Sequence, residues 1–174
     1  LAAEISAVLA LSASKNGDKV GLLLFSDRIE KVIPPKKGRT HVLRLIRELL
    51  TAKPEGRGTD LGGALAYVNR LLNRRAIVIL VSDFQDREFE KQLKITHRKH
   101  DLVNIVIQDE HENDLPDLGL IPLLDPETGN RILVDSSSRK ARVAFRERRM
   151  KRMAAMEELF RRYTIDGVFV QTNR

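Results

Sequence analysis

The residues with the clearest chemical use follow an aliphatic run over residues 76–81. A strand without polar alternation must be covered on both faces, so we expect a central parallel strand here. Ser82 and Asp83 end this run, at the carboxyl edge where open α/β sheets bind their ligands. Asp83 is therefore the first candidate functional residue. The alternative is that Asp83 only caps the next turn or helix.

A second candidate lies in the polar loop 51–60, where Gly58, Thr59 and Asp60 precede an expected helix. This loop and Asp83 are expected to converge at the same edge of the sheet. Hydroxyl and carboxylate oxygens are ligands that Mg²⁺, Mn²⁺ and Ca²⁺ prefer. Two ligands do not complete a site, so a third loop is needed, and it would follow a strand between those at residues 20–25 and 76–81.

The hydrophobic pattern alternates strands with helices along the chain. Helices are expected over residues 1–14, 41–50, 61–72, 87–100 and 138–162. Strands are expected over residues 20–25, 29–33, 76–81, 102–107, 120–124, 132–135 and 168–170. Pro34 and Pro35 are expected to stop the second strand, an antiparallel edge strand made by a hairpin. The alternation predicts an α/β fold with a doubly wound, mostly parallel sheet.

Length and composition limit the organisation of the chain. Its 174 residues, 42% hydrophobic and 32% charged, are enough for one α/β domain, residues 1–174, and too few for two ordinary ones. No apolar run approaches the ~20 residues of a membrane span. The absence of cysteine excludes disulfides, thiolate metal sites and a cysteine nucleophile. Because Leu1 is not an initiator methionine, we expect the sequence to be a fragment.

One segment carries the whole charge imbalance. Residues 138–162 contain ten Lys or Arg and three Glu, which accounts for the formal net charge of +7. Its candidate basic surface comprises Arg146, Arg148, Arg149 and Arg152. No aromatic residues alternate with these arginines as a stacking platform, which favours a solvated face or a docking surface for an acidic partner. Binding of nucleic acid or an anionic surface stays the alternative.

An ordered set of short motifs resembles a von Willebrand factor A-type domain. The motifs are Gly17-Asp18-Lys19-Val20-Gly21, Phe25-Ser26, Pro34-Pro35, Gly58-Thr59-Asp60-Leu61, Ala64-Leu65 and Ser82-Asp83-Phe84. A later set resembles the bacterial branch known as domain of unknown function fifty-eight. These motifs are Asp109-Glu110-His111-Glu112, Leu115-Pro116, Gly119 and Asp125-Pro126-Glu127-Thr128-Gly129.

The resemblance implies a three-layer, Rossmann-like fold with a metal-ion-dependent adhesion site for Mg or Mn. By the motifs, Thr59 is its second-loop ligand and Asp83 its third-loop ligand, the latter reaching the metal through water. Asp-x-Ser-x-Ser, the first-loop motif, is absent and is expected upstream of Leu1 together with the first central strand. Further partner-binding residues implied by the resemblance are Gly58, Asp60, Ser82 and Phe84.

For function, the resemblance implies a non-catalytic protein–protein interaction module. Its metal would take a partner's carboxylate as the open ligand. The implied partner is an AAA+ ATPase of the MoxR group, in an assembly or maturation role. The implied location is the cytoplasm, at the inner face of the cell membrane, with an anchor elsewhere in the full-length protein and no membrane contact by this fragment.

Other chemistries are weaker alternatives. A metal-dependent hydrolase would use Asp83 and the loop 109–114, and a zinc site would use His97 and His100 with Asp101. No Ser, Cys or Lys is placed beside these groups as a nucleophile, so we do not expect an enzyme. Gly56 and Gly58 lack the third glycine and the Gly-Lys-Ser/Thr of the nucleotide-binding loops.

Overall fold

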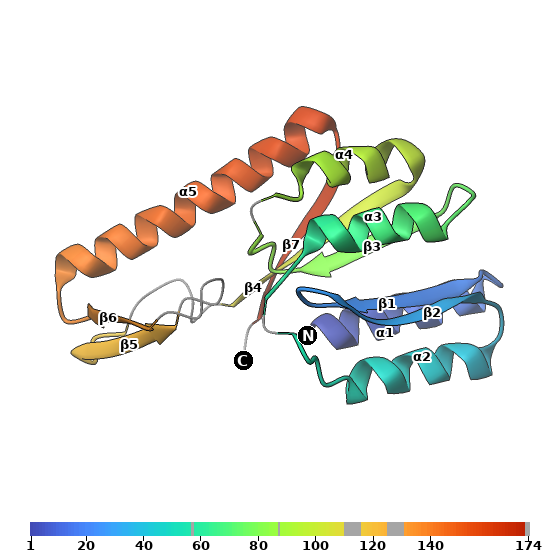
Figure 1. Cartoon of the computed structure of the whole chain (residues 1–174), viewed down its shortest axis with the longest axis horizontal. Coiled ribbons are helices and arrows are strands. Elements are labelled where there is room, and N and C mark those ends of the chain that lie inside the picture. The colour runs from blue at the N-terminus through green and yellow to red at the C-terminus, as the bar shows by residue number, and fades with distance from the viewer. Residues whose placement is uncertain (57, 87, 110–115, 125–130, 173–174) are drawn as a thin grey trace. The chain divides into compact units, whose positions relative to one another are not determined.

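The structure is a computed structural model that describes residues 1–56, 58–86, 88–109, 116–124 and 131–172 (Figure 1). The chain forms two compact units. The N-terminal unit comprises Leu1–Ile77 and Phe84–Asp101, and the C-terminal unit comprises Val78–Asp83 and Leu102–Arg174. The single domain expected over residues 1–174 stays a prediction, and the two units are taken in turn.

The N-terminal unit contains four helices and a β-hairpin in its described residues. They are α1 (Ala2–Lys15), β1 (Val20–Phe25), β2 (Ile29–Lys36), α2 (Arg39–Thr51), α3 (Leu61–Leu71) and α4 (Glu90–Lys99). Helix α1 ends as the sequence predicts, because Gly17 takes a left-handed φ of 76°. The amides of Gly17 and Asp18 then donate to the carbonyls of Ser14 and Ala13.

Strands β1 and β2 pair antiparallel, and α1 and α2 pack on the hairpin (Figure 1). The prediction that Pro34 and Pro35 stop β2 is wrong, because the strand continues to Lys36. The pairing shifts between Val20–Lys36 and Leu22–Ile33, which leaves both prolines in an irregular stretch of the ladder. A proline lacks the N–H that a regular ladder needs, so such a bulge accommodates it.

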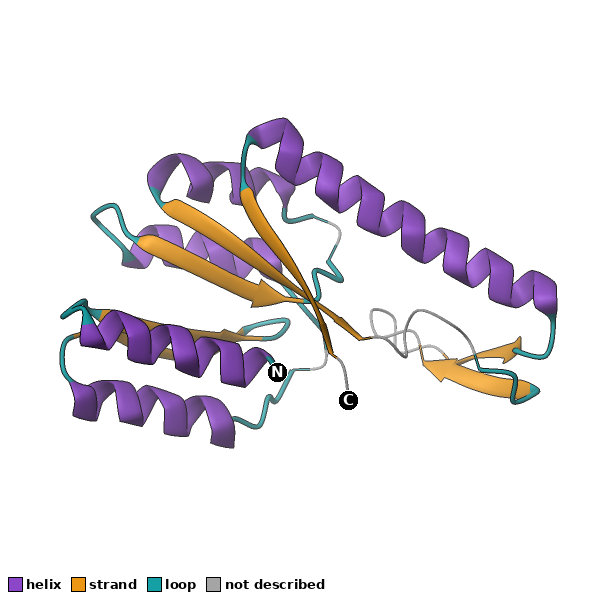
Figure 2. Cartoon of the chain, turned by 180° about the vertical axis from the view of Figure 1, so that it is seen from behind, coloured by secondary structure: helices purple, strands orange, loops and turns teal. Residues whose placement is uncertain are grey.

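The described residues of the C-terminal unit form a three-stranded sheet, whose first two strands each begin one residue inside the N-terminal unit, together with a hairpin and a long helix. They are β3 (Ile77–Ser82), β4 (Asp101–Asp109), β5 (Leu120–Leu124), β6 (Arg131–Asp135), α5 (Arg139–Tyr163) and β7 (Asp166–Thr172). The sheet has the order β3-β4-β7, and β4 and β7 run parallel (Figure 2). The antiparallel β5–β6 hairpin is confirmed, whereas its expected turn over residues 125–130 lies outside the described residues.

Helix α5 covers β7 with its C-terminal half. Met156 and Phe160 are buried, and the Phe160 ring lies 6.1 Å from the ring of Phe169. A Cβ on Gly167 would collide with the Phe160 ring, so the glycine lets the ring lie directly on the strand. Strand β7 is longer than the three residues that the sequence predicts.

Strand β3 is not central in the described sheet. It has one hydrogen-bonded neighbour, β4, among the strands that the structure describes. Ile77 and Ile79 are 70% and 39% exposed, although the aliphatic run predicted cover on both faces. The first central strand implied by the resemblance is not among the described strands.

The α/β class and the mostly parallel sheet are confirmed, and the three-layer, doubly wound arrangement stays a prediction. Helix α4 begins at Glu90, three residues after the predicted start. No helix in the described part of the chain is long and apolar enough to cross a membrane.

Candidate functional site

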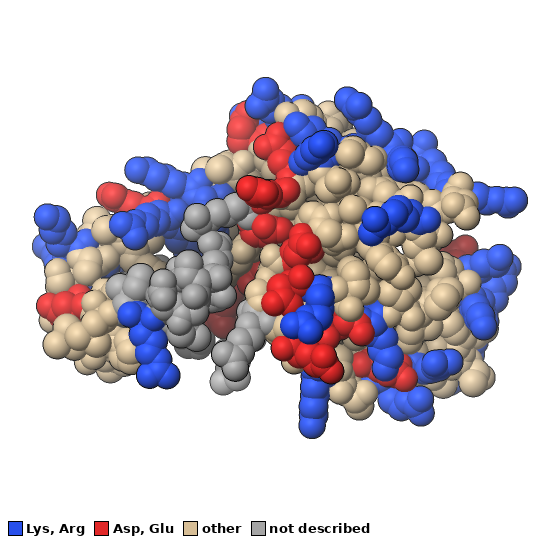
Figure 3. Space-filling view, in the orientation of Figure 1, with Lys and Arg blue, Asp and Glu red and all other residues tan. Residues whose placement is uncertain are grey.

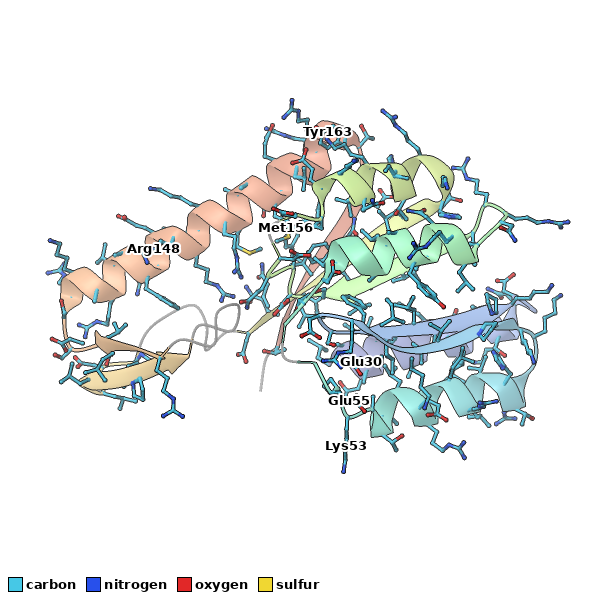
Figure 4. All side chains as sticks on the ribbon, in the orientation of Figure 1. Glu30, Lys53, Glu55, Arg148, Met156 and Tyr163 are labelled. Atoms are coloured by element: carbon cyan, nitrogen blue, oxygen red, sulfur yellow. The ribbon has the colours of Figure 1, made fainter. Side chains whose placement is uncertain are left out.

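The loop between α2 and α3 carries Thr59 and is held by side chains of the β1–β2 hairpin. We call residues 55, 56 and 58–60 of this loop the Thr59 loop. One carboxylate oxygen of Glu30 on β2 accepts the backbone amides of Glu55 and Gly56, at 3.1 and 2.9 Å. The same oxygen accepts the Ser26 hydroxyl at 2.5 Å. Figure 4 shows Glu30 and Glu55 lying close together at one end of the hairpin.

Ser26, directly after β1, forms a second attachment for the Thr59 loop. Its side chain is 7% exposed, and its carbonyl accepts the amide of Asp60 at 2.8 Å. A Cβ on Gly56 would collide with Ser26 Oγ and Asp27 Oδ1, so only glycine fits this close approach. The loop is therefore fixed to the turn between β1 and β2 at both of its ends.

The first turn of α3 follows the Thr59 loop and is capped by two carboxylates. Asp60 is the N-cap residue, and its Oδ1 accepts the amide of Gly63 at 2.6 Å. Asp86 Oδ2 accepts the amide of Leu61 at 2.8 Å, and Leu61 itself is fully buried. These contacts satisfy amides that an α-helix leaves unpaired at its start. Thr59 is consequently presented half-buried, immediately before a well-anchored helix.

The exit of β3 positions Asp83 differently. Asp83 is exposed, and the Ser82 hydroxyl donates to its Oδ1 at 3.4 Å. Phe84 takes a left-handed φ of 55°, which is costly for a residue with a Cβ. Its ring is 1% exposed and packs edge-on against Phe89 at 5.5 Å. Contact of this ring with a partner stays a prediction, and it would require the ring to leave that packing.

Thr59 belongs to the N-terminal unit and Asp83 to the C-terminal unit. Both supply hard oxygen donors, and the kind of donor fits Mg²⁺ or Mn²⁺. Within the described residues no three His, Asp or Glu side chains are grouped so as to hold a metal ion. A metal ion at either residue would therefore need further oxygen donors that no such cluster supplies.

The basic surface of α5 divides into exposed and anchored arginines. Arg146, Arg148 and Arg152 are exposed, and Figure 3 shows Lys and Arg side chains gathered along this helix. Arg149 is instead half-buried and donates to the carbonyl of Asp109 at 3.2 Å. The four predicted residues therefore do not form one uniform face, because Arg149 ties the helix to the end of β4.

In the described part of the chain, His97, His100 and Asp101 are not grouped so as to hold a metal ion. His100 is 2% exposed, and burial, with Lys99 and Arg75 nearby, lowers the pKa of its ring below the ordinary value. The Asp101 carboxylate accepts a hydrogen bond from Arg75 at 2.6 Å. Residues 110–114 of the alternative hydrolase loop lie outside the described residues.

Sequence reasoning missed Glu30 and Asp86, whose carboxylates hold the Thr59 loop and the start of α3. Glu30 reads as an ordinary polar residue of an edge strand. Asp86 lies three residues after Asp83 in a polar stretch, which gives no sign of its contact with the Leu61 amide. The available signal was the small residue Gly56, which indicates a close backbone approach without naming the residues that approach it.

Relatives of the chain share partial sequence identity with it. The chain is 27% identical over 132 residues to the uncharacterized protein Rv1480 of Mycobacterium tuberculosis H37Rv, a match that covers 74% of this chain and 42% of that protein. It is 30% identical over 100 residues to the uncharacterized protein MAV169 of Mycobacterium avium, covering 56% of this chain and 59% of that protein. The chain thus spans about half the length of these relatives.

Two solved structures share the fold. The conserved hypothetical protein BatB from Bacteroides thetaiotaomicron has a TM-score of 0.55 and 15% identity, over 98% of this chain and 80% of that one. An aerotolerance-related membrane protein from Bacteroides fragilis has a TM-score of 0.51 and 16% identity, over 99% and 81%. At these identities the likeness concerns the fold alone.

The motifs in the second half of the sequence predicted the bacterial family of unknown function, and the comparison confirms that part of the resemblance. The model of the family described as Protein of unknown function DUF58 matches residues 1–155. That range includes Thr59, Asp83 and most of α5. The chain belongs to this family.

Proposed function

We propose that this chain is a non-catalytic protein–protein interaction module that binds a divalent cation, Mg²⁺ or Mn²⁺, through Thr59 and Asp83. The observation that carries the proposal is the anchored Thr59 loop, which offers a hydroxyl oxygen immediately before α3. An exposed carboxylate at the carboxyl end of β3 supports it, because open α/β sheets use this edge for ligands. The remaining donors would come from an upstream Asp-x-Ser-x-Ser.

The proposed partner contributes an acidic side chain. A hard cation held by few protein charges keeps an open position for an outside carboxylate. The exposed Arg146, Arg148 and Arg152 favour the same class of partner, since they add attraction for an acidic surface. An AAA+ ATPase of the MoxR group is the partner that the resemblance implies, in an assembly or maturation role.

The proposed setting is the inner face of the cell membrane. The Bacteroides fragilis neighbour is named a membrane protein, and the chain spans only part of its relatives. In this proposal the membrane anchor lies elsewhere in the full-length protein, and the described units face the cytoplasm. The alternatives, a metal-dependent hydrolase and a nucleic-acid-binding helix, gain no specific observation.

The test is calorimetric titration of Mn²⁺ and Mg²⁺ into the full-length protein and into three single variants. Asp83→Ala and Thr59→Val should each weaken binding by at least about tenfold, because each removes an oxygen near the cation. Asp18→Ala, an exposed aspartate after α1, is the matched control and should bind like the unchanged protein. Absence of Mn²⁺ and Mg²⁺ binding by the full-length protein would overturn the proposal.

A further inference from the structure

We propose that Glu30 is a positioning residue that holds the Thr59 loop in the shape that presents Thr59. The expected effect of Glu30 on metal binding rests on the proposed function. The structural part of the proposal, that Glu30 fixes the loop, stands on contacts within the N-terminal unit.

Glu30 brings one oxygen atom to three donors from two different segments. The donors are the hydroxyl of Ser26 after β1 and the amides of Glu55 and Gly56. Hydrogen bonds to an ionised carboxylate are stronger than those between neutral groups. Consistently, these donors hold the pKa of Glu30 below its ordinary value, with Ser26 the largest cause and Gly56 the next. A single side chain on β2 thereby joins the hairpin to the Thr59 loop.

The loop has little freedom to make the same contacts in another shape. At one end, the space around Gly56 admits no Cβ, because Ser26 and Asp27 already fill it. At the other end, the Asp60 amide donates to the Ser26 carbonyl at 2.8 Å. Thr59 lies between the contacts at Glu55 and Gly56 and the contact at Asp60. Loss of the hydrogen bonds from Glu55 and Gly56 to Glu30 would therefore leave Thr59 held only on the Asp60 side.

Without a carboxylate at position 30, the amides of Glu55 and Gly56 lose their acceptor on the hairpin. Water can replace it, because the contact to Glu55 is exposed and the contact to Gly56 only partly buried. We therefore expect the loop to open locally while the rest of the unit stays folded. This separates a positioning role from a general role in folding.

The first experiment measures amide hydrogen exchange by NMR in the unchanged protein, Glu30→Ala and Glu30→Gln. In Glu30→Ala the amides of Glu55 and Gly56 should exchange at least about tenfold faster, since each loses its protein acceptor. Glu30→Gln is the matched control, because its side-chain oxygen can still accept the amides. Val106, fully buried on β4, should keep its exchange rate in all three proteins. Unchanged exchange at Glu55 and Gly56 in Glu30→Ala would overturn the inference.

The second experiment titrates Mn²⁺ into the same three full-length proteins. Glu30→Ala should weaken Mn²⁺ binding by about tenfold, and Glu30→Gln should retain most of it, because only the alanine variant frees the loop. A freed loop with unchanged Mn²⁺ affinity would overturn the positioning role. If the unchanged protein binds no Mn²⁺, the proposed function fails, and the exchange experiment decides on its own whether Glu30 fixes the loop.

Discussion

The two proposed metal ligands are positioned by opposite physical means. Thr59 sits in a polar loop that Ser26 and Glu30 hold through hydrogen bonds from another segment. Asp83 follows a strand directly, and the next residue, Phe84, buries its ring while its backbone takes a left-handed conformation. The position of Thr59 therefore depends on hydrogen bonds to a charged carboxylate, for which water can compete. The position of Asp83 depends on apolar packing of the Phe84 ring, which offsets the strain in that residue's backbone.

The largest effect is expected at Phe84. Replacement by alanine removes a ring that is 1% exposed, which should lower the free energy of unfolding by about 3–5 kcal/mol. Phe84→Gly loses the same ring but relieves the positive φ, so it should be more stable than Phe84→Ala by about 1 kcal/mol. Urea unfolding of both variants measures the difference. If Phe84→Gly is instead less stable than Phe84→Ala, the backbone at Phe84 is not strained.

A smaller effect separates two glycines of the Thr59 loop. Gly56→Ala places a methyl group against Ser26 and Asp27 and should cost about 1–3 kcal/mol. Gly58→Ala is the matched control, because its methyl group would meet the Asp27 Cβ at an ordinary 3.5 Å. Thermal unfolding of the two variants should show a lower Tm for Gly56→Ala alone. Equal Tm values would contradict the close approach of the loop to the hairpin.

The polar anchor also predicts that the stability contributed by Glu30 depends on pH. The pKa of Glu30 is lowered from its ordinary 4.5, first by Ser26 and then by Gly56, with further lowering by Glu55 and Arg28. A carboxyl whose pKa is lowered in the folded state stabilises the protein at pH values above its ordinary pKa. This contribution is lost as the pH falls through the folded-state pKa. The stability difference between the unchanged protein and Glu30→Gln should therefore shrink below about pH 4.5. A difference that stays constant from pH 7 to pH 3, measured by urea unfolding, would refute this.

The smallest changes in stability should come from replacing the two proposed metal ligands. Thr59→Val and Asp83→Ala remove oxygen donors without removing buried apolar packing, so each should shift Tm by less than about 2 °C. Differential scanning calorimetry without added metal gives this value. A larger loss in either variant would make that residue part of the scaffold, and its effect on metal binding would then need to be corrected for unfolding.

Local patterns were enough to predict several elements. The unbroken apolar run of β1 and the Gly17 stop after α1 each depend on residues next to one another in the chain, and both match the structure. The motif resemblance, which uses residues spread over most of the chain, identified the family correctly. Asp83 and the loop that carries Thr59 are candidates from their places in the sequence, and the resemblance to von Willebrand factor A-type domains adds the expectation that they bind a metal.

Features that depend on distant segments were not predictable. The path of β2 through Pro34 and Pro35 depends on a shift in its pairing with β1, which no composition rule specifies. The role of Glu30 depends on a loop more than twenty residues away in sequence folding back onto the hairpin. The exposure of Ile77 and Ile79 depends on which segments lie beside β3. The aliphatic run predicts that these side chains are buried, but it does not identify the segments that would bury them.

The single described neighbour of β3 also has a consequence for how the chain behaves in solution. Among the described strands β3 pairs with β4 alone, and its Ile77 and Ile79 are exposed. A strand edge of this kind is a template onto which another strand can add. Strand addition of this kind is second order in protein, so dilution slows it and concentration accelerates it. A sample of this chain alone is therefore expected to stay dispersed longest when dilute, and a short peptide strand that caps β3 would act as its stabiliser in storage.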